Sequence, residues 1–191
     1  MELIFATNNQ HKLEEVQQLI GSKFHLKSLA DIHCSDDIPE TGTSFEENAG
    51  QKSRYIFDRF TLNCFADDSG LEVEALNNEP GIYSARYSGA RDNEQNLHLV
   101  LEKLGNSTNR KARFVTVISL LMDGKEHLFK GTINGQIAHK PSGKKGFGYD
   151  PIFIPDGYAI TFADLDSSEK NRISHRAKAM QKLIKFLNTI G

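Results

Sequence analysis

The chain has 191 residues, which is enough for one domain with a substantial core or for two small lobes. Hydrophobic residues make up 38% and charged residues 25%, a balance that is typical of a globular protein and excludes an intrinsically disordered one. The net charge is −2, so no global basic field is available to grip a nucleic-acid backbone, and we expect no nucleic-acid partner.

The two cysteines and the N-terminal sequence bear on the compartment. Cys34 and Cys64 lie in unrelated contexts, without zinc-ligand spacing, and two thiols are too few for a disulfide framework. The first residues lack the pattern of a signal peptide, and no apolar run has the length of a membrane span. The sequence therefore predicts a cytoplasmic enzyme without a membrane partner.

The N-terminal part of the chain indicates a strand, a polar loop and a helix. Residues 3–6 form a short apolar run that ends in a polar turn. From Lys12, apolar residues recur at helical spacing until Gly21, and a second strand is expected at residues 24–29. In this order the loop lies at the carboxyl end of the first strand, where α/β sheets bind ligands.

A second helix is expected after residues 39–42. Ser44 and Glu47 have the spacing of a capping box, so the helix begins there. Asn48 and Lys52 lie four residues apart and share one side of this helix, from which both could face a cleft.

The remaining elements complete a mixed α/β (α+β) pattern. A helix is expected over residues 94–104, with Asp92 or Asn93 as its N-cap, and an apolar run at 114–121 meets an Asp-Gly pair that predicts a hairpin. The return strand continues to about residue 137. Apolar residues recur at helical spacing from Glu169 onward, which predicts one long C-terminal helix.

Two adjacent carboxylates are the sharpest chemical feature. Asp67 and Asp68 follow an apolar strand directly, where unpaired buried charges are costly. Mg²⁺ prefers carboxylate and water ligands and would offset their repulsion. In a strand the two side chains point to opposite faces, so one can reach a metal or an attacking water while the other braces the loop. The alternative is an ordinary Asp/Ser/Gly turn over residues 67–70, which the composition of this segment alone favours.

Three further segments have both a functional and a plain structural interpretation. The polar loop at residues 7–12 precedes a helix and could hold an anion, or it could be only a helix cap. The glycine-rich segment 142–151 could stack an aromatic ring on a flat heterocycle, or it could be a turn with its aromatic rings in the core. The charged segment 168–176 could contact phosphate and a base, or it could be a solvated helix face.

Taken together, six motifs in a fixed order resemble one family. They lie at residues 6–12, 45–52, 66–71, 80–87, 146–153 and 173–177. This series resembles the inosine/xanthosine triphosphate pyrophosphatase family, which removes deaminated purine nucleotides from the nucleotide pool, and it covers essentially the whole chain. The resemblance implies a single catalytic domain over residues 1–191, with an elongated mixed sheet flanked by helices, two lobes and the active site in the cleft between them.

The resemblance also implies roles for particular residues. Asp68 would be the general base and a ligand of Mg²⁺, Glu40 the second metal ligand, Ser69 a neighbour of the substrate, and Lys52 an extra phosphate contact. The triphosphate would be held by Thr7, Asn8, Asn9, Gln10, His11 and Lys12, with Lys170 as a further phosphate contact. The purine would be bracketed by Phe147, Gly148, Tyr149 and Asp150, and read by His175 and Arg176. The family usually has a small residue where this chain has Asn8 or Asn9, so these positions are expected to contribute backbone amides.

The expected reaction is hydrolysis of ITP, dITP and XTP to the monophosphate and pyrophosphate by a Mg²⁺-dependent homodimer. Hydrogen-bond donors aimed at a 6-oxo group would reject adenine, which carries an amino group there. Two alternatives remain open. One is a related pyrophosphatase for modified pyrimidine or methylated nucleotides, against which the predicted base-binding motif argues. The other is a nucleotide-binding module without turnover, against which the acidic pair argues.

Overall fold

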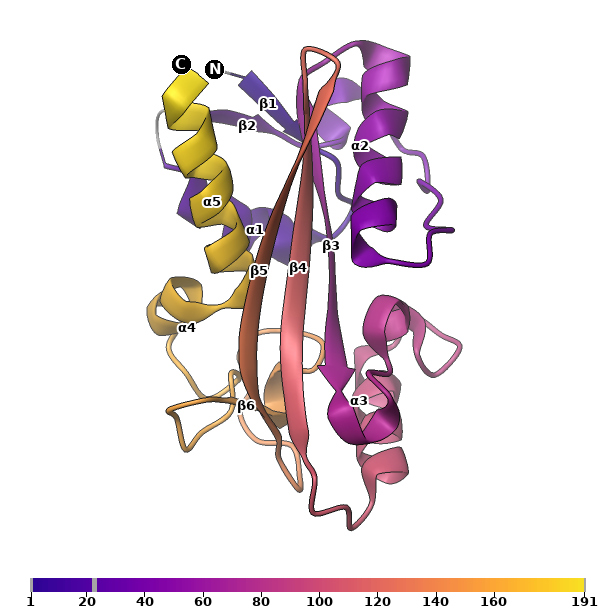
Figure 1. The fold of residues 1–191 in the computed structure, drawn as a ribbon, viewed down its shortest axis with the longest axis vertical. Helices are drawn as coiled ribbons and strands as arrows, with labels where there is room; N and C mark the ends of the chain where they lie inside the picture. The colour runs from indigo at the N-terminus through magenta and orange to yellow at the C-terminus, as the bar shows by residue number, and fades with distance from the viewer. Residues whose placement is uncertain (1, 22–23, 191) are drawn as a thin grey trace. The chain divides into compact units, whose positions relative to one another are not determined.

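The computed structural model describes residues 2–21 and 24–190, and it confirms a mixed α/β fold. Six strands form one sheet in the order β2-β1-β3-β4-β5-β6, flanked by helices (Figure 1). The chain divides into two compact units. Unit 1 comprises Met1–Asp68, Thr116–Gly131 and Arg176–Gly191, and unit 2 comprises Ser69–Val115 and Thr132–His175. Among the described helices, none combines the length and apolar character that a membrane span requires.

The helices and strands have the following bounds. The strands are β1 (Glu2–Phe5), β2 (His25–Lys27), β3 (Cys64–Val73), β4 (Lys111–Met122), β5 (Lys125–Ile137) and β6 (Phe153–Pro155). The α-helices are α1 (Gln10–Ile20), α2 (Phe45–Phe60), α3 (Asn93–Leu104), α4 (Ser167–Ile173) and α5 (His175–Ile190). Short 3₁₀ helices lie at Ala30–Ile32, Glu74–Leu76, Gly81–Arg86 and Asp150–Ile152.

Unit 1 is a sheet with helices on both faces. Strand β1 pairs in parallel with β2 and with β3. Since successive side chains of a strand point to opposite faces, Leu3 and Phe5 of β1 pack with α1 and α5, whereas Ile4 and Ala6 pack with α2. All four side chains are buried, so β1 is a central strand.

Local sequence signals set the ends of the unit 1 helices. Helix α1 begins at Gln10, with the side chain of Asn9 accepting a hydrogen bond from the Lys12 amide at 3.2 Å, and it ends at Gly21, which has a φ of 73°. Helix α2 is capped by Ser44, as the sequence predicts. The predicted second strand is shorter than expected and covers only His25–Lys27.

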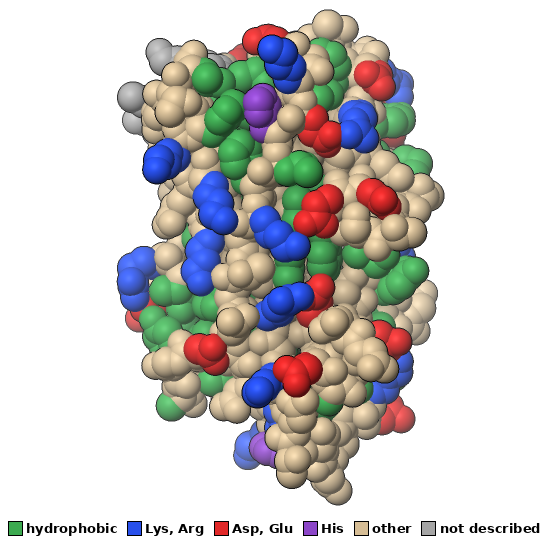
Figure 2. Space-filling view, viewed as in Figure 1, with side chains coloured by type: hydrophobic (Ala, Val, Ile, Leu, Met, Phe, Trp, Pro, Cys, Tyr) green, Lys and Arg blue, Asp and Glu red, His purple; other side chains and the backbone are tan. Residues whose placement is uncertain are grey.

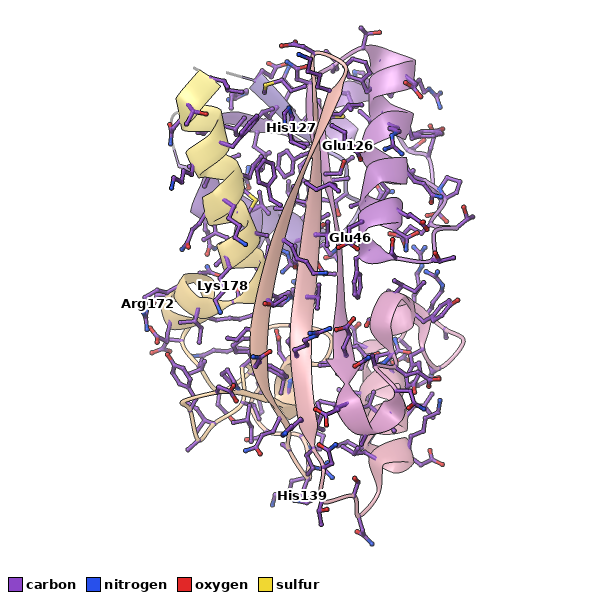
Figure 3. The ribbon with its side chains drawn as sticks, in the orientation of Figure 1. Glu46, Glu126, His127, His139, Arg172 and Lys178 are labelled. Atoms are coloured by element: carbon purple, nitrogen blue, oxygen red, sulfur yellow. The ribbon has the colours of Figure 1, made fainter. Side chains whose placement is uncertain are left out.

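The hairpin between β4 and β5 confirms the Asp-Gly signal, because Asp123 and Gly124 both have positive φ, at 49° and 76°. The hairpin is tied to α2 near its tip by Arg54 with Glu126, and further along β5 by Lys130 with Glu46 at 3.1 Å (Figure 3). Buried hydroxyls of α2 and β4, Ser53 and Ser119, also lie 2.7 Å apart. These contacts fix α2, which carries Asn48 and Lys52.

Unit 2 is built around a separate hydrophobic core. The ring of Phe114 on β4 lies 4.6 Å from that of Phe153 on β6 and 6.0 Å from that of Phe162, measured between ring centroids. Strand β6 pairs antiparallel with β5. Helix α3 is capped by the side chain of Asp92, which accepts hydrogen bonds from the amides of Glu94 and Gln95.

Two sequence interpretations are wrong. Residues 67–70 are not a turn, since β3 runs unbroken from Cys64 to Val73 and carries both acidic residues within it. The predicted long C-terminal helix is two helices, α4 and α5, because Ser174 between them has an extended backbone with φ −63° and ψ 159°. The Ser174 amide caps the end of α4 by donating to the Lys170 carbonyl at 2.9 Å.

Charged side chains on the face shown in Figure 2 mix both signs, in keeping with the net charge of −2.

Candidate active site

The predicted site residues form two clusters, one in each unit. In unit 1, Asp68 is 7% exposed, and its Oδ2 accepts a hydrogen bond from Asn48 Nδ2 at 3.0 Å. Burial raises the pKa of Asp68, the charge of Glu40 raises it further, and Lys52 and Lys12 oppose the rise. A carboxylate with a raised pKa and an oriented oxygen has the properties of a general base.

Helix α2 brings a second acidic residue into this cluster. Lys52 lies one turn after Asn48 and its Nζ is 2.5 Å from Glu40 Oε1. Burial alone would lower the pKa of Lys52, but the carboxylates of Asp68, Glu40 and Asp67 outweigh it and raise the pKa. The predicted shared orientation of Asn48 and Lys52 is therefore confirmed.

Asp67 points to the other face of β3 and belongs to a chain of alternating charges. Its side chain is 2% exposed, and its two carboxylate oxygens lie 3.0 Å and 2.9 Å from Lys12 Nζ. Arg176 Nε is 3.6 Å from Asp67 Oδ2, and the same guanidinium donates to Glu15 on α1. Burial lowers the pKa of Lys12, and Asp67 opposes that effect. Asp67 thus holds Lys12 and Arg176, whereas the sequence predicts only that one of the two carboxylates braces the loop.

The loop at residues 7–12 is a helix cap in this structure. Thr7 Oγ1 accepts from the Asn9 amide at 3.1 Å, Asn8 donates to the Asp36 carbonyl at 3.1 Å, and Asn9 caps α1. Gln10 and His11 are exposed in the first turn. The cap interpretation is confirmed, and phosphate binding by this loop stays a prediction.

The acidic side chains of unit 1 include two candidates for binding Mg²⁺, Asp68 and Glu40. Within residues 2–21 and 24–190 no group of three or more His, Cys, Asp and Glu side chains could hold a metal ion by itself. Glu40 lies close enough to Asp68 to raise its pKa, so these two carboxylates repel each other. Mg²⁺ usually keeps several waters and takes one or two carboxylates together with substrate phosphates. Two carboxylates, Asp68 and Glu40, are thus compatible in number and chemistry with Mg²⁺ that arrives with a polyphosphate, and Mg²⁺ binding itself stays a prediction.

The cluster in unit 2 is centred on a buried ion pair. Lys170 Nζ lies 2.7 Å from Asp150 Oδ2, with 8% and 4% of the two side chains exposed. The Phe147 amide donates to the same carboxylate at 2.8 Å, and the Lys170 ammonium lies 5.1 Å from the centre of the Phe147 ring. Gly146 is required here, because its φ is 75° and a Cβ would lie 2.1 Å from Asp150 Oδ2.

The other predicted base-binding residues divide between core and site. The Tyr149 ring is buried in the core of unit 2, and its hydroxyl donates to the Ser84 carbonyl at 2.8 Å. The His175 ring stacks on Phe114 with centroids 4.6 Å apart and 10° between planes. The plain interpretation of this segment, with aromatic rings in the core, thus holds for Tyr149, whereas Phe147 is half-buried. Base contact by these residues stays a prediction.

Sequence reasoning missed two partners in these clusters. The sequence predicts Glu15 only as a residue of the first helix, whereas in the structure it forms an ion pair with Arg176. Its position three residues after Lys12 places it on the same helix face as that lysine, but no local pattern indicates Arg176 as its partner. Ser84 lies in the motif at residues 80–87, where the sequence indicates no role for it, and its hydroxyl accepts a hydrogen bond from the Leu71 amide at 2.9 Å. Gly148 has a φ of 62° with open space around it, and Ser69 is half-buried in β3.

A sequence model of the Ham1 family matches residues 3–186. The chain belongs to the Ham1 family. A protein named dITP/XTP pyrophosphatase from Flavobacterium johnsoniae is 47% identical over 188 residues, which is 98% of each chain. The structure of the Staphylococcus aureus Ham1 protein is similar with a TM-score of 0.91 at 44% identity and covers 100% of both chains. A HAM1 protein from Coxiella burnetii also has a TM-score of 0.91, at 38% identity over 99% of both chains. The Ham1 similarity thus spans both clusters.

Proposed function

We propose that this protein hydrolyses non-standard purine nucleoside triphosphates, among them ITP, dITP and XTP, to the monophosphate and pyrophosphate. The observation that carries the proposal is Asp68, a buried carboxylate oriented by Asn48 and held at a raised pKa. Support comes from membership of the Ham1 family and from similarity to a protein named dITP/XTP pyrophosphatase.

Asp68 is the general base of the proposed reaction. One of its oxygens takes a proton from a water molecule, and the water oxygen attacks the α-phosphorus in line with the departing group. The bond from the α-phosphorus to the bridging oxygen breaks, and its electron pair leaves with pyrophosphate. The hydrogen bond from Asn48 keeps the Asp68 carboxylate in one orientation during this transfer.

The cations of unit 1 act on the triphosphate. Lys52 pairs with Glu40, whereas Lys12 pairs with Asp67 and acts on Asp68 only through its charge, and the positive charge of both lysines stabilises the departing pyrophosphate. When it is bound by Asp68 and Glu40, Mg²⁺ supplies charge neutralisation on the phosphate oxygens. The amides at the start of α1 add hydrogen-bond donors for a phosphate.

The cluster of unit 2 is assigned to the purine. Phe147 offers a half-buried aromatic face, and Asp150 and Lys170 supply an acceptor and a donor within the same small cluster. A 6-oxopurine presents an acceptor at position 6 and a donor at position 1, which matches such a pair. Adenine presents the reverse pattern, a donor at position 6 and an acceptor at position 1, so it makes neither hydrogen bond. We therefore propose that 6-aminopurines bind more weakly than 6-oxopurines. Lys170 is thereby assigned to the base as well as to phosphate, and His175 and Arg176 are proposed as further donors.

Pyrophosphate release from ITP, measured with and without Mg²⁺, tests this proposal. Wild-type protein is expected to turn over ITP only with Mg²⁺, and Asp68→Asn to lose nearly all turnover. An Asp68→Asn variant with wild-type turnover would exclude Asp68 as the base. A panel that adds modified pyrimidine and methylated nucleotides tests the related-substrate alternative, and ITP binding without turnover would favour the binding module. We also propose that the protein is a cytoplasmic homodimer. The molar mass of the purified protein, measured by light scattering, tests the dimer.

A further inference from the structure

Lys52 has an unusual position for a residue expected to bind phosphate. Its side chain is 11% exposed, and its ammonium lies against the carboxylate of Glu40, one of the two groups that fit a metal ion. Asn48, one turn earlier on α2, holds the other group, Asp68. Helix α2 therefore contacts both carboxylates, one through a neutral amide and one through a cation.

The electrostatics of this arrangement resemble those of a bound cation. The Lys52 ammonium lies 2.5 Å from Glu40 Oε1 and its side chain is mostly buried, so its charge acts on the carboxylate with little screening by solvent. The ammonium thus offsets the repulsion between the two carboxylates, which is the same effect that a metal ion would have. It also leaves this group of three side chains with a single net negative charge, which attracts a divalent cation less than two free carboxylates would.

Lys12, the other cation near Asp68, is engaged differently. Both oxygens of Asp67 lie within 3.0 Å of its ammonium, on the opposite face of β3. Removal of Lys12 would take this ion pair from Asp67 and would leave the pair between Lys52 and Glu40 in place.

We propose that Lys52 is the resident counter-ion of the metal site, which pairs with Glu40 in the nucleotide-free protein and moves to the triphosphate when substrate binds. The transfer would free Glu40 at the moment when phosphate oxygens also become available as ligands. Metal and triphosphate would then bind cooperatively, and the protein would hold little Mg²⁺ without substrate. This inference rests on the proposed magnesium-dependent function.

The affinity for Mn²⁺ alone, measured by electron paramagnetic resonance without any nucleotide, tests this inference. Lys52→Met removes the cation and keeps an apolar side chain of similar length, so we expect Mn²⁺ to bind about tenfold more tightly or better than to wild type. Lys52→Gln serves as a second neutral variant if the methionine variant does not fold, and Lys52→Arg, which retains the charge, should bind Mn²⁺ as wild type does. An unchanged or weaker affinity in the neutral variants, or a gain in Lys52→Arg, would overturn the inference.

Two controls make the result specific. Lys103→Met removes an ion-paired lysine of unit 2 whose side chain is 43% exposed and whose partner is Glu79, and it should leave the Mn²⁺ affinity unchanged. Combining Lys52→Met with Glu40→Gln should abolish the gain, and a gain that persists would refute the role of Glu40. Because no turnover is measured, a protein that gains Mn²⁺ affinity without hydrolysing ITP would contradict only the proposed function.

Discussion

The same substitution at two adjacent positions should change stability in opposite directions. Asp67 is 2% exposed and is contacted by Lys12 at 2.9 and 3.0 Å and by Arg176 at 3.6 Å. Asp67→Asn removes the charge that compensates two buried cations, which typically costs about 3–5 kcal/mol when one partner of a buried pair is lost. At roughly 2–4 °C per kcal/mol for a chain of this size, the melting temperature should fall on the order of 10 °C.

Asp68→Asn should instead raise the melting temperature. The pKa of Asp68 is raised mainly by burial, so its ionised form is disfavoured in the folded protein. A raised folded-state pKa means that stability is lost as the pH rises through that pKa. The advantage of the Asn variant should therefore be largest at neutral pH and shrink as the pH falls below the folded pKa of Asp68.

Thermal unfolding in a buffer with EDTA, followed by circular dichroism from neutral to acidic pH, measures both effects. Turnover of ITP should be lost in Asp68→Asn and reduced in Asp67→Asn. Activity should therefore fall while stability rises in Asp68→Asn, whereas both should fall in Asp67→Asn. If both variants lost the same stability at neutral pH, the interpretation would be wrong that Asp67 is stabilised by ion pairs and that the ionised form of Asp68 is disfavoured by burial.

Three other predictions concern side chains away from Asp68. Lys170→Met should lower the free energy of unfolding in urea by about 3–5 kcal/mol, because the Asp150 carboxylate stays buried without its partner, and adding Asp150→Asn should restore much of that stability. A double-mutant cycle that shows no coupling between the two residues would contradict this prediction. Gly146→Ala should raise the KM for ITP far more than Gly148→Ala, whose new Cβ meets open space, and equal effects would count against the close approach to Asp150. Burial raises the pKa of the Cys64 thiol to about 12, so a variant lacking the other cysteine should resist iodoacetamide at pH 8 until unfolded; rapid native alkylation would refute this.

The sequence predicts the parts of the fold that depend on local chemistry. Ser44 and Asp92 cap their helices by hydrogen bonds to amides two or three residues away, and the turn at Asp123 needs only residues that tolerate positive φ. Each of these signals lies within a few residues of its effect. The position of Asn48 and Lys52 on one helix side follows in the same way from helical periodicity.

Features that depend on distant parts of the chain were missed. The break at Ser174 cannot be seen in a periodic pattern that continues on both sides of it. Residues 67–70 have the composition of a turn, but they continue β3, whose Phe65 packs in the core on one face and whose Cys64 and Ala66 pack in the core on the other. Arg176 meets Glu15 across 161 residues of sequence, so no local pattern could assign that partner.

The division of unit 1 into three segments has a consequence for synthesis on the ribosome. Helix α5, at the very end of the chain, supplies Met180, Leu183 and Leu187 to the core in which Leu3 and Phe5 of the first strand are buried. At translation rates of about 5–20 residues per second, the first strand waits on the order of ten seconds or more for its partner. The N-terminal segment therefore emerges with apolar side chains whose burial is complete only when the last helix has been made. A nascent chain stalled before residue 175 should accordingly bind chaperones and should not form a folded half of the enzyme.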